Sequence, residues 1–182
     1  MKVTRLRLPE VLLIEPRVFE DSRGWFYESF NARSFADATG LDVSFVQDNH
    51  SLSAKGVLRG LHYQLPPSAQ GKLVRVLSGS ILDVAVDVRR SSPTYRQWLV
   101  QEVGASDRQQ IYVPVGFAHG FVALEDETEV LYKTTDFYAK DAERSIRWDD
   151  PELAIAWPEG LLPVLADKDA AAPLLRDAET FD

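Results

Sequence analysis

An arginine and a histidine stand together in one strand-like segment. Residues 57–64 read VLRGLHYQ, rich in the branched and aromatic residues of a β-strand, yet they include Arg59 and His62. Residues three apart face opposite sides of a regular strand, but Gly60 between them predicts a bulge that brings both to one side. Histidine is the commonest proton-transfer group near neutral pH, which makes His62 a candidate general base. The alternative is a hydrogen-bonded core histidine beside a surface arginine.

A second histidine, His119, lies in residues 114–121, PVGFAHGF, where proline and glycine favour a tight turn before a strand. Phenylalanines stand two residues before and two residues after it, and residues two apart face the same side of a strand. His119 is therefore predicted to lie on the same face as these two large apolar side chains. Small barrels of the cupin type have a PxGxxH segment like this one, and in metal-binding members an earlier HxH pair completes the ligand set. Here Gln64 replaces the second histidine of that pair, which makes a poor site for a divalent metal. The sequence therefore indicates a cupin-type barrel that works without a metal, with a satisfied core histidine as the alternative for His119.

Three further side chains have chemistry suited to a pocket. Lys72 begins a strand just after Gln70 and Gly71, and its ammonium could face a cavity, although an exposed strand end is the commoner fate of a lysine. Arg23 precedes an aromatic strand and could clamp a phosphate, since guanidinium groups bind phosphates bidentately. Tyr132 is in phase with an apolar neighbour, so its ring is predicted to point inward. Taken alone, that pattern favours a buried, hydrogen-bonded tyrosine.

The elements that must position these residues are mostly strands. From residue 44 to residue 148, short strand-like runs alternate with turn signals about every dozen residues, which predicts a β-sandwich or barrel. Residues 72–77 and 81–88 flank Ser-Gly-Ser and are predicted to form a hairpin. In the second of these runs Asp83 lies on the polar side of the strand, from which we infer that it holds Lys72 or His119.

Outside the strand-rich region the chain offers few elements. Residues 31–40 predict a helix, with an asparagine cap at its start and a glycine at its end. Residues 151–165 are proline-rich and loop-like, and residues 168–178 could hold a short helix. We expect a single domain over residues 1–182, in which an arm of about 151–182 packs on the barrel.

The overall composition limits the partners. The chain has 28 acidic and 20 basic residues and a net charge of −8, which argues against nucleic acid and anionic membranes as partners. A few arginines focused in a cleft still leave room for a small anionic ligand. The absence of cysteine excludes disulfides and thiolate catalysis. The N-terminal residues lack the continuous apolar run of a signal peptide, and we expect a soluble, cytoplasmic protein.

Eight segments in order resemble the dTDP-4-dehydrorhamnose 3,5-epimerase family of nucleotide-sugar enzymes. They are DSRGWFYES at 21–29, QDNHS at 47–51, VLRGLHYQ at 57–64, QGKLVRV at 70–76, DVAVDVR at 83–89, PVGFAHGF at 114–121, LYK at 131–133 and DKDAAAPLL at 167–175. The resemblance covers nearly the whole chain. It implies a mainly all-β fold, a double-stranded β-helix or jelly roll of the cupin type with a few short helices. It also implies a homodimer in which an N-terminal strand joins the partner's sheet, with no metal and no cofactor.

The resemblance further implies the reaction and the residues that perform it. The substrate would be dTDP-4-dehydro-6-deoxy-D-glucose, inverted at C3 and C5 to give dTDP-4-dehydro-L-rhamnose. His62 would be the base, Asp169 its orienting carboxylate, Tyr132 the proton donor on the opposite face, and Lys72 the cation for the enolate oxygen, with His119 close by. Nucleotide and sugar contacts would come from Arg23, Glu28, Gln47, Asp48, Asn49, Arg59, Lys72, His119, Glu143 and Lys168.

Other functions compete with this one. A relative that inverts only C3, or a 3,4-ketoisomerase acting on a dTDP-keto-sugar, would share the barrel, but His62, Tyr132 and Asp169 together favour inversion at two carbons. A metal-dependent cupin oxygenase or isomerase is disfavoured by Gln64. A sugar-sensing barrel without catalysis would not need a base, an acid and an orienting carboxylate together.

Overall fold

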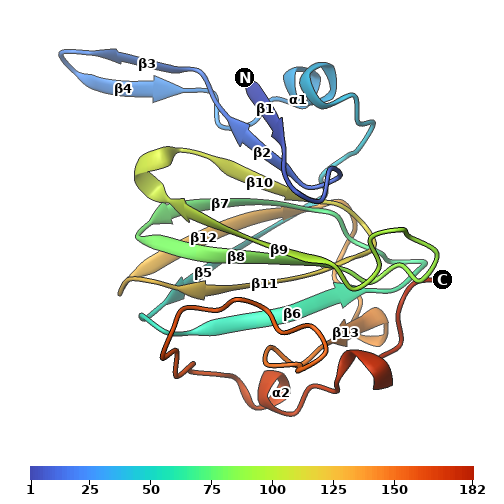
Figure 1. Cartoon of the computed structure of the whole chain (residues 1–182). Coiled ribbons are helices and arrows are strands. Elements are labelled where there is room, and N and C mark those ends of the chain that lie inside the picture. Colours follow the sequence, from blue (N-terminus) through green and yellow to red (C-terminus); the bar gives the residue numbers. More distant parts are fainter.

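Two antiparallel β-sheets face each other in the computed structural model, which describes residues 1–182 (Figure 1). One sheet has six strands in the order β1-β2-β10-β7-β12-β5, and the other has five in the order β13-β6-β11-β8-β9. The strands of the first sheet are β1 (Lys2–Arg5), β2 (Leu12–Glu15), β10 (Gln110–Val113), β7 (Lys72–Ser78), β12 (Thr128–Thr134) and β5 (Gln47–Ser53). Those of the second are β13 (Glu143–Ser145), β6 (Leu58–Gln64), β11 (Phe117–Ala123), β8 (Ser80–Asp87) and β9 (Trp98–Gly104).

The chain passes repeatedly from one sheet to the other, which is the pattern of a double-stranded β-helix. Strand β5 lies in the first sheet and β6 in the second, and the same alternation holds for β7 and β8 and for β10 and β11. Strands distant in sequence therefore become neighbours, as β2 and β10 do. The predicted all-β jelly roll of the cupin type is confirmed.

The hairpin predicted around Ser78, Gly79 and Ser80 is wrong. Strand β7 pairs with β10 and β12, whereas β8 pairs with β9 and β11, so the turn joins the two sheets instead of two neighbours in one sheet. Gly79 has a φ of +71°, and a Cβ at this position would lie only 2.4 Å from Thr128 Oγ1. A hairpin within one sheet and a connection between two sheets can have the same local sequence, a glycine turn between two apolar strands. Only the packing of the sheets decides which of the two forms.

The predicted helix at residues 31–40 is confirmed as α1 (Ala32–Thr39). The side chain of Asn31 accepts a hydrogen bond from the Ser34 amide at 3.1 Å, and Gly40 ends the helix in the left-handed conformation with a φ of +74°. Phe35 is the buried anchor of the helix, and it packs with Tyr112 on the outer face of the six-stranded sheet.

The hydrophobic core has two main parts. One fills the space between the sheets and includes Ile81, Ala85 and Phe121. The other lies on the outer face of the five-stranded sheet, where Val84 and Val86 meet Leu153 and the other C-terminal apolar residues Ile155, Leu175 and Ala178. Because side chains alternate along β8, Asp83 shares its face with Ile81 and Ala85 and points between the sheets.

The C-terminal segment runs along the outer side of β6 and β13 (Figure 1). Its helical part is shorter than predicted. Helix α2 (Asp167–Ala170) begins one residue before the expected 168–178 span and stops before Pro173, since proline lacks the amide that a helix interior requires. Three short 3₁₀ helices complete the chain at Ala105–Asp107, Lys140–Ala142 and Leu175–Asp177. None of the helices is long and apolar enough to cross a membrane.

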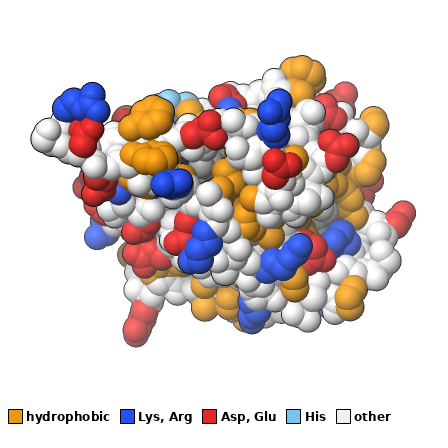
Figure 2. All heavy atoms as spheres, turned by 90° about the horizontal axis from the view of Figure 1, so that it is seen from above, with side chains coloured by type: hydrophobic (Ala, Val, Ile, Leu, Met, Phe, Trp, Pro, Cys, Tyr) orange, Lys and Arg blue, Asp and Glu red, His pale blue; other side chains and the backbone are white.

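Strands β3 (Val18–Asp21) and β4 (Gly24–Tyr27) form a separate hairpin that projects from the barrel beside β2 (Figure 1). Its side chains are largely uncovered: Phe26 is 70% exposed, and Phe19 and Trp25 are also exposed. Figure 2 shows hydrophobic side chains gathered over the hairpin, at the left of this face. Single exposed apolar residues are ordinary on a protein surface, but a group of aromatic rings on a projecting element is typical of a contact surface.

Candidate active site

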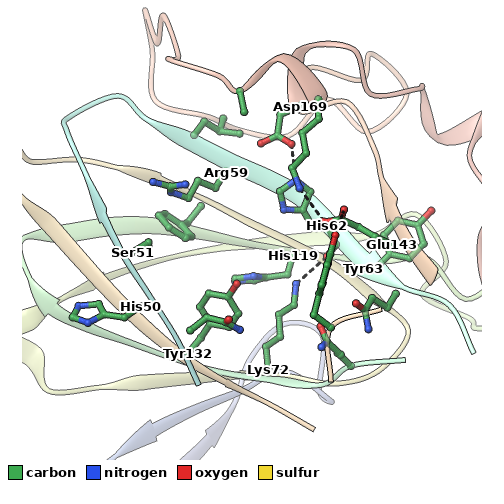
Figure 3. A pocket seen from close by; sticks show the side chains of 18 of the residues that line it. His50, Ser51, Arg59, His62, Tyr63, Lys72, His119, Tyr132, Glu143 and Asp169 are labelled. Atoms are coloured by element: carbon green, nitrogen blue, oxygen red, sulfur yellow. Dashed lines mark hydrogen bonds and ion pairs between the residues drawn. The ribbon is translucent and has the colours of Figure 1, made fainter. Parts of the chain in front are cut away.

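A cavity of about 540 Å³ opens between the two sheets, and ten of the residues predicted for the site line it (Figure 3). They are Gln47, Asn49, Arg59, His62, Lys72, His119, Tyr132, Glu143, Lys168 and Asp169. The two sheets contribute opposite walls. His62 and His119 come from the five-stranded sheet, whereas Lys72 and Tyr132 come from the six-stranded one. A ligand between the walls therefore meets the imidazoles from one side and the phenol from the other.

A β-bulge in β6 brings His62 into this cavity. In the pairing with β11, His119 stands opposite His62 and Phe121 opposite Arg59, so three steps along β6 match two along β11. The extra residue turns both Arg59 and His62 toward the cavity, as Gly60 predicted. Gly60 has a φ of +136° and its Cα packs against Gly120, which leaves no space for a side chain at either position.

His62 and Asp169 form a close imidazole–carboxylate pair. Nε2 of His62 lies 2.6 Å from Oδ1 of Asp169, which is buried in α2 of the C-terminal arm. Burial would raise the pKa of Asp169, but the hydrogen bond and the charge of His62 outweigh it and hold the pKa below its usual range. A carboxylate at Nε2 orients the ring and stabilises its protonated form, which leaves Nδ1 to exchange a proton with a ligand.

Lys72 provides a partly buried cation in the same cavity. Its Nζ donates to the backbone carbonyl of His62 at 3.1 Å, and burial lowers the pKa of Lys72 to about 8. Attraction to Asp83 and Glu143 opposes the effect of burial, and Lys168 adds to it. An ammonium held in a cavity between two sheets is well suited to meet a developing negative charge on oxygen.

Tyr132 reaches the cavity from β12 and packs against the core between the sheets, as its parity predicted. Burial raises the pKa of Tyr132, partly offset by the positive charges of Arg59 and Lys168. A phenol of raised pKa keeps its proton at neutral pH and is available as a donor.

The mouth of the cavity is held by polar contacts. Lys168 Nζ lies 2.9 Å from Glu143 Oε1, and the Tyr138 hydroxyl donates to the other carboxylate oxygen of Glu143 at 3.1 Å. Burial would raise the pKa of Glu143, but these hydrogen bonds hold it below its usual range. Gln47 donates to Asn49 at 3.0 Å, and Arg59 Nε donates to Ser53 at 3.1 Å.

Three predicted residues lie away from this cavity within one chain. Arg23 lies at the turn of the β3–β4 hairpin, where it pairs with Asp21. Glu28 accepts hydrogen bonds from Asn31 and Ser34 next to α1. Asp48 faces the opposite side of β5 from Gln47 and Asn49, because side chains alternate along a strand, and it pairs with Lys133 at 3.0 Å.

The sequence analysis missed Tyr138 and gave no role to the side chain of Gln64. The adjacent aromatic residues Phe137 and Tyr138, shortly after the end of β12, are the sequence signal that could have indicated the first of these. Gln64 donates to the carbonyls of Ser68 and Phe137, and its own carbonyl accepts from the Ala139 amide at 2.9 Å. The amide therefore braces a loop at the cavity wall, a role that a single sequence does not reveal. No cluster of three or more histidine, aspartate or glutamate side chains is arranged as a metal site.

Fold and cavity together define a class of protein: a cupin-type jelly roll whose interior is equipped for proton transfer at carbon. The comparisons with known proteins agree. The family model for dTDP-4-dehydrorhamnose 3,5-epimerase matches residues 5–177. A dTDP-4-dehydrorhamnose 3,5-epimerase from Pseudomonas aeruginosa is 56% identical over 100% of this chain and 99% of its own length. The chain belongs to the dTDP-4-dehydrorhamnose 3,5-epimerase family.

Solved structures give the same picture. The dTDP-6-deoxy-D-glucose-3,5-epimerase from Legionella pneumophila, in complex with dTDP-4-keto-L-rhamnose, aligns with a TM-score of 0.93 and 47% identity over 97% of this chain and 93% of its own. A 3'-monoepimerase from Streptomyces bikiniensis, in complex with dTDP-quinovose, aligns with a TM-score of 0.89 and 36% identity over 97% of this chain and 88% of its own. The fold is thus shared by one-carbon and two-carbon enzymes, and the sequence lies nearer the two-carbon enzyme.

Proposed function

We propose that this protein is a dTDP-4-dehydrorhamnose 3,5-epimerase, an isomerase that inverts C3 and C5 of dTDP-4-dehydro-6-deoxy-D-glucose to give dTDP-4-dehydro-L-rhamnose. The observation that supports this best is the arrangement of His62 and Tyr132 on opposite walls of one cavity, with Lys72 between the sheets beside them. Inversion at carbon requires a base on one face and a proton donor on the other, and these two side chains meet that requirement.

Each inversion takes two proton transfers. C3 and C5 both flank the C4 ketone, so their C–H bonds are acidic. Nδ1 of His62 takes the proton from one carbon, and the electron pair of the broken C–H bond moves into the ring as the ketone becomes an enolate. The ammonium of Lys72 stabilises the charge on the enolate oxygen. Tyr132 then donates its proton to the opposite face of the carbon, which leaves a protonated His62 and a phenolate that return to their starting states by exchange with water.

The carboxylate of Asp169 makes the first transfer possible. It holds Nε2 of His62 at 2.6 Å, which orients the ring and stabilises the imidazolium as the proton arrives. This function requires no metal and no organic cofactor.

A homodimer would account for the predicted residues that lie away from the cavity. Arg23 and Glu28 belong to the projecting β3–β4 region, and its aromatic side chains are exposed in the single chain. We propose that this region packs on a second copy of the chain, where Arg23 would reach the diphosphate and Glu28 and Asp48 would lie near the nucleotide. Arg59, which already lines the cavity, would bind the diphosphate from within the same chain.

We further propose that residues 1–182 act as one domain, because the C-terminal arm supplies Asp169 to the cavity and apolar side chains to the core. The substrate carries a charged diphosphate and does not cross a bilayer unaided. The enzyme therefore shares a compartment with the reaction that makes the substrate, and we propose that this is the cytoplasm.

Incubation with dTDP-4-dehydro-6-deoxy-D-glucose in heavy water tests the reaction. Mass spectrometry and proton NMR of the hexose should show two solvent deuterons, one at C3 and one at C5, together with the inverted product. A single deuteron at C3 would identify a one-carbon epimerase like the relative from Streptomyces bikiniensis. No incorporation at either carbon would refute the proposal.

A further inference from the structure

A second imidazole–carboxyl pair lies beside the first and has no part in the mechanism above. Oδ2 of Asp83 lies 2.8 Å from Nε2 of His119. His119 stands directly opposite His62 in the pairing of β11 with β6, so the two imidazoles are neighbours across the strands and line the same cavity (Figure 3). Each ring is held at Nε2 by a carboxyl group, one from β8 and one from α2.

Asp83 occupies a position that packing alone would give to an apolar residue. It is fully buried, it shares its face of β8 with Ile81 and Ala85, and it stands opposite Phe121. One of its oxygens, Oδ1, is also buried and has no hydrogen-bond partner in the chain. Burying a carboxyl group that is only half satisfied lowers the stability of the fold. A group that costs stability in this way calls for a functional reason.

The side chains around Asp83 point to that reason. Nδ1 of His119 has no protein partner and belongs to a ring that lines the cavity. Lys72 makes a single hydrogen bond, to the His62 carbonyl, so two of its three donors are free. The free donors of Lys72 and the second nitrogen of His119 therefore line one cavity, and the unpaired oxygen of Asp83 is buried next to it.

We propose that Asp83 is a positioning residue, which holds His119 through Nε2 so that Nδ1 faces the ketone oxygen and the ring shares the enolate charge with Lys72. When the keto-sugar binds, Nδ1 takes up a proton from water and the ring becomes an imidazolium. Nε2 then donates to Asp83 and Nδ1 to the ketone oxygen, and the carboxylate stabilises the positive ring as negative charge develops on that oxygen. This inference rests on the proposed function, because it needs a ketone to act on.

Asp83 also acts on Lys72 through charge. Its attraction opposes the burial that lowers the pKa of Lys72 to about 8. The ionisable and polar groups that face Lys72 come from every neighbouring element: Asp83 in β8, Glu143 in β13, Lys168 in α2, His62 in β6, His119 in β11 and Tyr132 in β12. Removal of the charge at Asp83 leaves burial less opposed, so the alkaline limit of kcat/KM moves to lower pH.

The main experiment compares Asp83→Asn with the unmodified protein. The substitution keeps the shape of the side chain and removes its charge. We expect kcat for epimerisation, and the rate of deuteron exchange at C3, to fall by about 10²-fold, the low end of the cost of losing one oxyanion donor. The KM for the keto-sugar and the Kd for dTDP, which has no ketone, should change by less than about threefold.

The matched control is Asp150→Asn, a buried carboxyl just before the C-terminal arm that caps backbone amides away from the cavity. It should lower the melting temperature and leave kcat unchanged.

A double-mutant cycle separates positioning from a structural role. If Asp83 acts through His119, adding Asp83→Asn to His119→Asn should cost less than about threefold beyond His119→Asn alone. Losses that multiply in the double variant would overturn the inference, as would an Asp83→Asn variant with normal kcat or one that loses dTDP binding in parallel.

A measurement on the unmodified protein covers the case in which Asp83→Asn does not fold. Nitrogen-15 NMR should find the proton of His119 on Nε2, bonded to Asp83, and a ring protonated on Nδ1 alone would overturn the inference. The two proposals also fail differently. If the unmodified protein exchanges no deuterons, both the proposed function and this inference are refuted. If the unmodified protein and Asp83→Asn turn over at the same normal rate, the proposed function stands and only the inference about Asp83 is refuted.

Discussion

At the scale of single residues, the proposed mechanism assigns the base and the acid to opposite walls of the cavity. His62 comes from the five-stranded sheet and Tyr132 from the six-stranded sheet, so the flat keto-sugar would lie between a base and an acid. The two side chains therefore have separable roles, because loss of the base stops the first proton transfer and loss of the acid stops the second.

Two substitutions should separate these roles. His62→Ala should abolish deuteron exchange at both carbons, because no proton can be removed. Tyr132→Phe should slow net inversion by about 10²–10⁴-fold, as loss of a general acid does, while the first proton abstraction is slowed less. Exchange followed by NMR, set against product formation by chiral analysis, measures both rates. If Tyr132→Phe inverts at the normal rate, the acid is another group.

Lys72 should impose an alkaline limit on activity. Burial lowers its pKa from the ordinary 10.5 to about 8, so kcat/KM should fall as the pH rises through about 8 and the ammonium becomes neutral. Stability should move the other way: above pH 8 the unfolded chain binds more protons than the folded one at this group, so its contribution to the free energy of unfolding rises with pH until about 10.

A pH profile of kcat/KM, run beside urea denaturation at the same pH values, tests this expectation. Activity lost without loss of folded protein supports the role of Lys72. The variant Lys72→Arg keeps its charge at all of these pH values, so its kcat/KM should show no alkaline limit. Its rate should be lower at every pH, because the guanidinium group is larger than the ammonium. A limit that persists at the same pH in Lys72→Arg would assign the titration to another group.

At the scale of elements, the site depends on how closely β6 and β11 approach. A Cβ at Gly120 would lie 2.7 Å from the Arg59 carbonyl oxygen and 2.9 Å from Leu61 Cδ2. To make room for this methyl group, the backbone of β6 would have to shift, and this shift would displace the bulge that orients His62. We therefore expect Gly120→Ala to lower the free energy of unfolding by about 1–3 kcal/mol, the usual cost of overpacking, and to reduce kcat as well.

Gly104→Ala is the control for that prediction. Its Cβ would meet Asp107 Oδ2 at 3.2 Å, a contact that a small shift of this side-chain end relieves while it keeps its hydrogen bond to the Gly104 amide. The change in unfolding free energy should stay within about 0.5 kcal/mol, with turnover unaffected. Urea titration and steady-state assays measure both variants. Equal effects of the two substitutions would mean that the contact between β6 and β11 does not govern the site.

At the scale of the whole molecule, the exposed aromatic hairpin should hold two chains together. Replacing Trp25 and Phe26 together by serine removes two of the three exposed aromatic rings of the hairpin and leaves Phe19. It should shift the protein from dimer to monomer and weaken binding of dTDP, because Arg23 would no longer reach the site of a second chain. Sedimentation velocity and calorimetry measure the two effects.

Leu162→Ser is the matched control, since this leucine is 89% exposed but lies in the C-terminal arm, far in sequence from the hairpin. It should leave both the dimer and the affinity for dTDP unchanged. An unmodified protein that sediments as a monomer, or a hairpin variant that stays dimeric, would contradict the proposed assembly.

The sequence by itself determined the strand-rich region, the capped helix at residues 31–40 and the inward faces of Tyr132 and His119, because these follow from alternation and capping over a few residues. It also predicted the bulge at Gly60. The eight family segments then supplied candidate residues that no local pattern could have linked, such as His62 and Asp169, which are 107 positions apart.

Only the tertiary structure decided which of those candidates meet. The turn at Gly79 crosses between sheets instead of closing a hairpin, because register and sheet membership depend on partners distant in sequence. The same pairing places His119 opposite His62 and buries Asp83 behind it. Asp48 faces away from the cavity of its own chain because alternation along β5 gives it the face opposite to Gln47 and Asn49. Arg23 and Glu28 lie away from it because the β3–β4 region that carries them projects from the barrel, and only packing fixes where a projecting element lies.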